Sequence, residues 1–409
     1  MKRTKIAAID AGTTKVCTIM ADTNGTGDVR ILGVGMATSE GLEKGVVINT
    51  EKATASISKS LRKAQKMAGY SLRSAYVGVS GTDMSSLNNK GVVSIPHNNE
   101  VVHRSDQKRA LEIGRSVEIP KEQKLLHVIP RSYKLDGKGN IKDPVGMYGF
   151  RLDVETHIVT TPATLVQNLA KCIISLGISI DGMVLTSLAS AEAVLTEDER
   201  QNGVMLVDIG GATTDVAIFK EGNIHNTFNL PIGGHHITND IAIGLQIPFE
   251  IAEKMKQEYG DVNPFEEKDS SNITTTEDGH SVSQYDLYEI IEARIEELFR
   301  LIIFNMQEAN YAKVIPSGLV LTGGSSNLQG IAELGGKVTK LPVRVGIPLN
   351  LDASNVDLCD PACATSIGLL YWKIRQTGSQ GWDIRKKGLE ILLPKWLGYF
   401  NSKKLAYVK

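Results

Sequence analysis

The sequence predicts an α/β protein with two lobes that are built on a duplicated unit. Two similar stretches occur in distant parts of the chain, AAIDAGTTKVCTIM at 7–20 and VDIGGATTDVAIF at 207–219. Each runs from apolar residues through an Asp, a Gly and two threonines into a second apolar run. A chain of 409 residues is long enough for two or three domains with cores of their own.

Each stretch is expected to form a β-hairpin. The runs KIAAI and GVMLVDI are short, apolar and β-branched, which predicts buried strands. A glycine then permits a tight turn. Backbone N–H and hydroxyl groups at such a tip can cradle a phosphate, and the residues that offer them are Thr13, Thr14, Lys15, Thr213 and Thr214.

The Asp at the entrance of each hairpin predicts a metal site. Like charges repel, so Asp10 and Asp208 are unsuited to direct contact with phosphate. Mg²⁺ keeps several waters and takes few carboxylates, so we expect both residues to hold Mg²⁺ through water. One such hairpin would most simply be an ordinary Gly/Thr turn. Two matching copies favour a pair of lobes that grip one polyphosphate from opposite sides.

Two later stretches fit the rest of a nucleotide. GLVLTGGSSNLQGI at 318–331 predicts a strand, a Gly-Gly turn and a helix, and the glycines would allow a flat ring such as adenine to approach the backbone. PFEIAEKMKQEYG at 248–260 predicts a helix with Ile251 and Met255 on one face. Glu253 and Lys256 share another face, where they would either hold a ribose or form an i,i+3 charge pair.

These motifs resemble the actin/Hsp70/sugar-kinase superfamily. The stretches 41–81 and 125–160 further resemble the FtsA family of bacterial cell-division proteins, and the resemblance covers nearly the whole chain. It implies a two-lobed actin-like fold, that is, a duplicated ribonuclease H-like α/β fold. An FtsA-type inserted subdomain and a C-terminal amphipathic helix complete the expected architecture.

The resemblance also implies a set of domain boundaries. They are 1–83 for the first-lobe core with the first phosphate hairpin, 84–162 for the inserted subdomain, 163–199 for the first-lobe continuation and an interdomain helix, 200–242 for the second-lobe core with the second hairpin, 243–312 for an outer subdomain that binds nucleotide and the FtsZ tail, 313–360 for the second-lobe core with the adenosine turn, 361–376 for another interdomain helix, 377–388 for a linker and 389–409 for a membrane-targeting segment.

ATP and Mg²⁺ are the cofactors that the resemblance implies. The first phosphate loop would comprise Asp10, Gly12, Thr13, Thr14 and Lys15. The second would comprise Asp208, Gly210, Gly211, Thr213 and Asp215. The turn near the γ-phosphate would use Gly233 and Gly234, the ribose Glu253 and Lys256, and the adenine Gly323, Gly324 and Ser325.

One departure from the relatives concerns hydrolysis. Many of them carry Glu-Pro or Gln before the second hairpin, where it positions the attacking water, but here Thr186 and Ser187 occupy that place. A hydroxyl can orient water but is a poor general base. We therefore expect ATP binding with at most slow hydrolysis, with Asp208 and Thr186 as the catalytic candidates.

The end of the chain has a different composition. After TGSQG at 377–381, residues 382–409 contain seven Lys/Arg and two acidic residues. Basic residues beside an apolar helical stripe predict an interfacial amphipathic helix, with Leu389, Leu392, Leu393, Lys395, Trp396, Leu397, Phe400, Lys403 and Lys404 toward the lipid. Alternatively the stripe docks on the protein itself, and Pro394 either starts the helix or interrupts it.

The function that the resemblance implies is a membrane-bound filament. The protein would polymerise head to tail at the cytoplasmic face of the cell membrane, at the division septum. There it would bind the C-terminal peptide of FtsZ, tether the Z-ring and help to recruit later divisome proteins. A net charge of −1 gives no reason to expect nucleic acid. A PilM-like adaptor of pilus assembly and a small-molecule kinase of the same superfamily are the alternatives.

Overall fold

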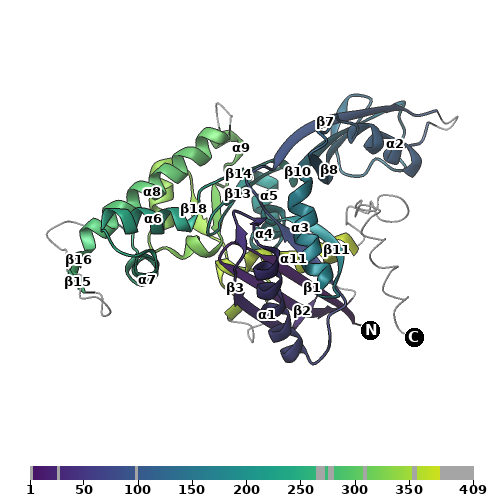
Figure 1. Ribbon diagram of the computed structural model, residues 1–409. Coiled ribbons are helices and arrows are strands. Elements are labelled where there is room, and N and C mark those ends of the chain that lie inside the picture. Colours follow the sequence, from purple (N-terminus) through teal and green to yellow (C-terminus); the bar gives the residue numbers. More distant parts are fainter. Residues whose placement is uncertain are drawn as a thin grey trace, which may run out of the picture.

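The structure is a computed structural model with two lobes and an inserted sheet (Figure 1). It describes residues 3–24, 28–96, 100–263, 272–274, 281–306, 311–351 and 357–377. The predicted linker and membrane-targeting segment lie outside the described residues. Within the described ranges, no helix has the length and apolar character needed to cross a membrane.

The first lobe is built on a five-stranded sheet. In spatial order its strands are β11 (Ser179–Leu185), β6 (Ser74–Val79), β1 (Thr4–Ala11), β2 (Lys15–Thr23) and β3 (Val29–Thr38). β1, β2 and β3 form an antiparallel meander, whereas β6 and β11 run parallel to β1. The other elements are the short strands β4 (Leu42–Glu43) and β5 (Val46–Val47) and the helices α1 (Thr50–Ala68) and α3 (Ala163–Ser175).

The second lobe repeats this topology. Its strands are β14 (Asn223–Leu230), β13 (Thr214–Lys220), β12 (Val204–Ile209), β17 (Leu319–Thr322) and β18 (Val343–Val345). β12, β13 and β14 form the meander, and β17 and β18 continue the sheet in parallel. Both predicted hairpins, β1–β2 and β12–β13, are therefore confirmed as equivalent parts of a duplicated unit.

The described part of the second lobe has six further helices. They are α5 (Glu197–Asn202), α6 (Gly234–Gly244), α7 (Phe249–Tyr259), α8 (Gln284–Asn305), α9 (Tyr311–Val314) and α10 (Ile331–Thr339). Of these, α6, α7 and α8 lie at the left of Figure 1. The predicted helix at 248–260 is confirmed as α7, with Ile251 and Met255 buried. Before α8 lie the paired strands β15 (Asn272–Thr274) and β16 (Ser281–Ser283), and Val262 and Val282 are buried.

The inserted subdomain forms a separate sheet at the upper right of Figure 1. Its elements are β7 (Ser85–Ser94), α2 (Arg104–Gly114), β8 (Gln123–Leu135), β9 (Lys138–Ile141) and β10 (Arg151–Pro162). It also contacts β14 of the second lobe through the buried His157, whose Nε2 lies 2.9 Å from Thr227 Oγ1 and whose Nδ1 lies 2.8 Å from Asn88 Oδ1. Burial lowers the pKa of His157 to about 3, so the neutral ring is held between the two sheets.

Two helices pass between the lobes. α4 (Thr186–Val194) follows β11, and α11 (Ala364–Thr377) packs against α4, β1, β2 and β6. One hydrophobic cluster runs through both helices and contains residues of each lobe's sheet, among them Ile9, Leu206 and Val320. The lobes are therefore joined by a packed core.

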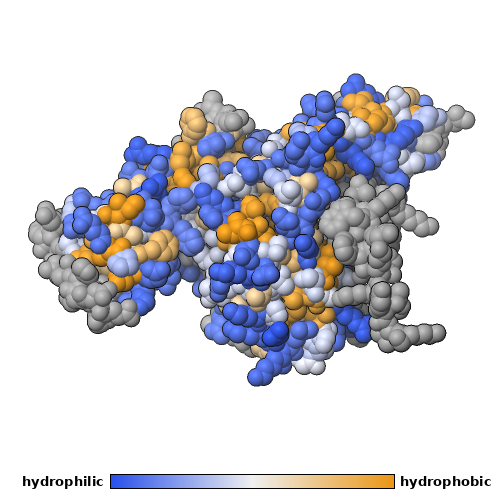
Figure 2. All heavy atoms as spheres, in the orientation of Figure 1, coloured by the Kyte–Doolittle hydropathy of each residue, from blue (hydrophilic) through white to orange (hydrophobic). Residues whose placement is uncertain are grey.

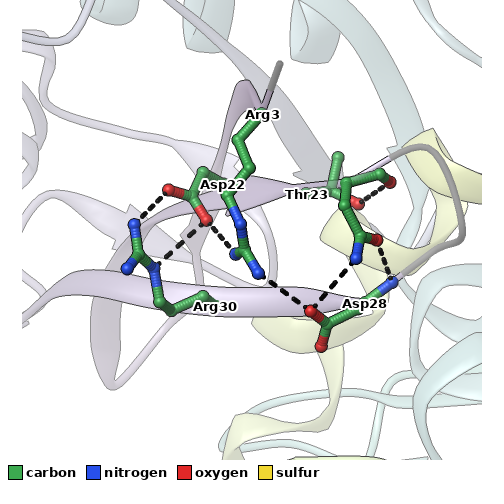
Figure 3. A network of polar contacts seen from close by, with 6 residues as sticks. Arg3, Asp22, Thr23, Asp28 and Arg30 are labelled. Carbon is green, nitrogen blue, oxygen red and sulfur yellow. Dashed lines mark hydrogen bonds and ion pairs between the residues drawn. The ribbon is translucent and has the colours of Figure 1, made fainter. Parts of the chain in front are cut away.

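A polar network fastens the far end of the first hairpin (Figure 3). Arg30 Nη2 lies 2.7 Å from Oδ2 of the buried Asp22, and Arg3 donates to both Asp22 and Asp28. Burial opposes ionisation of Asp22, but the hydrogen bonds and charges of the two arginines outweigh it and lower the pKa of Asp22. This network ties β1, β2 and β3 together at the end opposite the Gly/Thr tip.

Candidate functional site

The tips of the two hairpins have the same turn. Gly12 N donates to Lys15 O at 3.0 Å, and Gly210 N donates to Thr213 O at 2.9 Å. Each turn comes two residues after an Asp near the end of the preceding strand, Asp10 in β1 and Asp208 in β12. The shared sequence pattern thus corresponds to a shared local structure.

The two tips face each other across the lobes. A Cβ atom placed on Gly211 would lie 2.4 Å from Thr14 Cγ2, so a side chain at 211 would run into the tip of the first hairpin. Lys15 of the first hairpin donates to the carbonyl of Ala362, just before α11. The geometry therefore brings both predicted phosphate loops to one place.

The threonines of the two motifs are not equivalent. Thr13 and Thr14 form the first tip, whereas Gly211 and Ala212 take those positions in the second. Thr214 is fully buried, and its Oγ1 donates to Ile232 O at 2.7 Å. The expectation that Thr214 offers its hydroxyl to a ligand is therefore wrong.

Three carboxylates gather beneath the tips. Asp208 and Asp215 are buried and form a register pair between β12 and β13. Burial raises the pKa of Asp10 to about 6. The positive charge of Lys15 lowers this pKa, and the negative charge of Asp208 raises it. Burial and the charge of Asp208 raise the pKa of Asp215 to about 7, and burial also raises the pKa of Asp208. So much negative charge in a buried place favours protonation or a bound cation.

One oxygen of Asp215 makes no hydrogen bond in the described ranges, although the nearby Asn229 side chain helps to lower the pKa of this carboxyl. Its Oδ2 accepts a hydrogen bond of 3.1 Å from Thr186 Oγ1, at the first turn of α4. Its Oδ1 is buried and has no hydrogen-bond partner within the described structure. Buried polar atoms in native proteins are nearly always paired, so this oxygen marks a position for a water, an ion or a ligand. The structure therefore brings Thr186 and Asp215 together at the second hairpin.

The glycines at the start of α6 lie against the second tip. Gly234 N donates to Gly210 O at 2.9 Å, and a Cβ on Gly233 would lie 2.7 Å from that same oxygen. Ser325 Oγ, in the 3-10 turn Gly324–Asn327 after β17, also donates to Gly210 O, at 3.1 Å. The predicted γ-phosphate turn and adenine turn therefore meet at Gly210.

Glu253 and Lys256 form an ion pair on α7. Lys256 Nζ lies 2.7 Å from Glu253 Oε2 and also donates to Gly234 O at 3.1 Å. Thr238 of α6, which sequence reasoning missed, bonds both residues. Burial disfavours the ionised Glu253, but its bonds to Lys256 and Thr238 outweigh that effect and lower its pKa. The sequence signal that could have identified Thr238 is its spacing, because it lies one helical turn after Gly234 and so on the same face of α6.

Gly323 links the adenine turn to the carboxylates. Its φ is 84°, a left-handed conformation, and a Cβ there would lie 2.4 Å from Asp208 Oδ1 and 2.5 Å from Ile209 O. No cluster of three or more His, Cys, Asp or Glu side chains in the described ranges has an arrangement suited to ligating a metal directly. The predicted site residues thus form one continuous group around the two tips.

Comparison with known proteins identifies relatives along nearly the whole chain. Residues 205–368 match the family model "Cell division protein FtsA", and residues 81–160 match "SHS2 domain inserted in FTSA". The FtsA protein of Pseudomonas aeruginosa is 37% identical, with 94% of this chain and 92% of that protein covered. The FtsA protein of Escherichia coli K12 is 31% identical, with 98% and 97% covered.

Solved structures show the same fold at low identity. A PilM–PilN type IV pilus biogenesis complex matches with a TM-score of 0.64 and 16% identity, covering 91% of this chain and 99% of that one. MreB5 of Spiroplasma citri bound to ADP matches with a TM-score of 0.50 and 14% identity, covering 88% and 94%. The predicted two-lobed actin-like fold with an FtsA-type insertion is confirmed, and the insertion is of the SHS2 type.

Replacing Gly323 with Ala tests the close approach to Asp208. Gly137 is a matched control, because its φ is 80° and nothing lies within 4 Å of an added Cβ. We expect Gly137→Ala to lower the free energy of unfolding by about 1 kcal/mol, from backbone strain alone. Gly323→Ala should lower the free energy of unfolding by clearly more. The two variants are compared by the shift in the midpoint of thermal unfolding, measured by calorimetry. Equal shifts for the two variants would contradict this account of the turn.

Proposed function

The chain belongs to the FtsA family of cell-division proteins, and from that premise we propose that it binds Mg–ATP between its lobes. In this state it would form head-to-tail filaments that tether FtsZ filaments to the cytoplasmic face of the membrane at the septum. The observation that carries the nucleotide proposal is the pair of equivalent hairpin tips that meet at Thr14 and Gly211 above buried carboxylates. Structures of MreB5 with ADP and with AMPPNP support it, since they share the fold.

The residues present fit a magnesium nucleotide. The Oδ1 of Asp215 makes no hydrogen bond in the described structure, and Gly210 and Gly211 are half-buried, with Thr14 of the facing tip against Gly211. Asp10 and Asp208 would hold the ion through water, in keeping with the lack of a direct three-residue ligand cluster in the described ranges. When bound, Mg²⁺ would neutralise phosphate charge, which lets the anion sit beside these carboxylates.

The protein's own groups would then each have a simple role. N–H groups at the tips and Lys15 would bind the phosphates. Glu253 and Lys256 would exchange part of their ion pair for hydroxyls of the ribose, and Gly324 and Ser325 would lie against the adenine. Thr186 would orient water, but its hydroxyl is already donated to Asp215 and is a poor base. We therefore propose slow hydrolysis, below about 1 s⁻¹.

The family match weighs against the alternatives from the sequence. PilM-like structures share the fold at 16% identity, which carries no function, whereas FtsA relatives are 31–37% identical over nearly the whole chain. A small-molecule kinase would need a catalytic Asp and an acceptor pocket in the first lobe, and the sequence offers no such motif. We therefore do not retain either alternative.

The membrane segment would begin just beyond α11. Arg375, in the last turn of that helix, lies 2.9 Å from both carboxylate oxygens of Glu192 on α4. This pair fixes the C-terminal end of α11, from which the segment would extend, to α4. One amphipathic tail should bind lipid weakly and reversibly, while many tails on one filament gain by effective concentration. Attachment would therefore depend on polymerisation.

FtsZ recruitment to anionic liposomes tests this function. We expect the full chain with Mg–ATP to carry FtsZ into the pellet. A chain that ends at Thr377 should leave FtsZ in the supernatant because it lacks the tail. Asp208→Asn should lower recruitment because it weakens nucleotide binding, whereas Asp181→Asn, an exposed carboxylate of the first lobe, should not. If the full and shortened chains stay equally in the supernatant, the tether proposal fails.

A groove in the outer part of the second lobe is our proposed site for the FtsZ peptide. It lies between α6 and α8, has a volume of about 360 Å³ and is lined by Asp240, Ile243, Gly244, Ile290, Ala293, Arg294 and Glu297. Ile243 is 69% exposed. Figure 2 shows hydrophobic residues gathered over this part of the lobe. Arg294 lies 2.9 Å from Asp240 and also bonds Glu297, so the apolar floor has a charged rim.

Ile243→Asp should weaken binding of an FtsZ C-terminal peptide at least about tenfold, since a charge would replace buried apolar contact. Ile113→Asp is the matched control. Ile113 is also exposed and occupies the same position near the end of an 11-residue helix, α2 of the insert. The dissociation constant is measured by fluorescence anisotropy. Unchanged affinity in Ile243→Asp would place the peptide elsewhere.

A further inference from the structure

The two helices between the lobes bring hydroxyl groups onto the carboxylates of the site. Thr186 and Ser190 lie one turn apart on α4, and Thr365 and Ser366 begin α11. Ser190 Oγ donates to Asp208 Oδ2 at 2.6 Å, and Ser366 Oγ lies 3.4 Å from Asp10 Oδ2. Both interlobe helices therefore touch the carboxylates proposed to hold Mg²⁺.

Asp208 receives hydroxyls from both helices at one oxygen. Thr365 Oγ1 donates to the same Oδ2 at 3.2 Å, and it lies 2.9 Å from Ser190 Oγ. All three side chains are buried, and Ser190 is fully so. Hydrogen bonds to a charged group in a buried place are stronger than neutral ones. The triangle therefore fixes the direction of the carboxylate.

Ordinary helix packing does not require these hydroxyls. α4 is buried on nearly all sides, and its other buried positions include Leu188, Ala189, Ala191 and Ala193. An Ala at 190 would pack as well, but would leave the Asp208 oxygen with one partner fewer. Because Ser190 and Thr365 donate to one oxygen from two different helices, they hold the Asp208 carboxylate in one orientation.

We propose that Ser190 and Thr365 are positioning residues, which hold Asp208 in the orientation that a hydrated Mg²⁺ of bound ATP requires. The inference rests on the proposed nucleotide-binding function, and it connects the ion site to the two helices between the lobes. Because one hydroxyl comes from α4 and the other from α11, a shift of one helix against the other changes the support of Asp208. The angle between the lobes and the affinity for the ion are thereby coupled.

The test measures ATP affinity with and without the ion, using full-length protein. Outer-shell partners of metal-bound groups typically affect metal affinity about 10- to 100-fold. We expect Ser190→Ala and Thr365→Val each to raise the Kd of Mg–ATP about 10-fold in calorimetric titrations. The Kd of ATP in EDTA should change less than about twofold, because these residues act through the ion. Thr365→Ser should retain the wild-type Kd, since it keeps the hydroxyl.

Ser60→Ala is the matched control. Ser60 of α1 is also fully buried, and its Oγ donates to Thr18 Oγ1 at 2.7 Å, away from the hairpin tips. The Ser60→Ala variant should lose about as much stability as Ser190→Ala, but its Kd for Mg–ATP should equal that of the wild type. Thermal unfolding of the apo proteins checks that each variant is folded. Should Ser190→Ala fail to fold, the comparison of Thr365→Val with Thr365→Ser makes the same test from the other helix.

The possible outcomes distinguish a failure of the positioning role from a failure of the proposed nucleotide binding. A wild-type chain that binds no Mg–ATP overturns both proposals. If the wild type binds Mg–ATP and the variants bind it equally well, only the positioning role is overturned. Equal losses with Mg²⁺ and in EDTA would also overturn it, because the effect would then not pass through the ion.

Discussion

The structure depends on how three carboxylates are kept close together in a buried place. Asp10, Asp208 and Asp215 lie beneath two facing turns, and burial raises the pKa of each. Burial makes ionisation of all three less favourable, and Lys15 and the hydroxyls of α4 and α11 supply part of the compensation. Bound Mg²⁺ would supply the rest, so the proposed nucleotide binding would also stabilise this group of carboxylates.

The interlobe helices connect this site to the rest of the molecule. On α4, Glu192 lies 2.9 Å from Arg375 and 3.4 Å from the buried Arg200, whose guanidinium stacks on Phe219 of the second lobe. The same helix presents Ser190 and Thr186 to the carboxylates. The pair with Arg375 joins α4 to α11, and the pair with Arg200 joins α4 to α5. The proposed nucleotide site and the packing of the two lobes therefore depend on the same pair of helices.

Local features of the site could be predicted from the sequence, and long-range ones could not. The two hairpins and the helix α7 follow from short patterns of apolar residues, glycine and charge, because those elements are specified by neighbours in the chain. The contact between Ser190 and Thr365 joins residues 175 positions apart, and no periodicity predicts it. The Thr214 hydroxyl is taken up by a bond to Ile232 O, a partner that the motif does not contain.

A structure of the full chain with Mg²⁺ and a non-hydrolysable ATP analogue tests the central claim most directly. The account predicts the triphosphate between Thr14 and Gly211, with the ion's waters on Asp10 and Asp208 and the adenine beside Ser325. It would be contradicted by an analogue bound elsewhere while the two tips remain in contact, or by those two carboxylates turned into separate cavities.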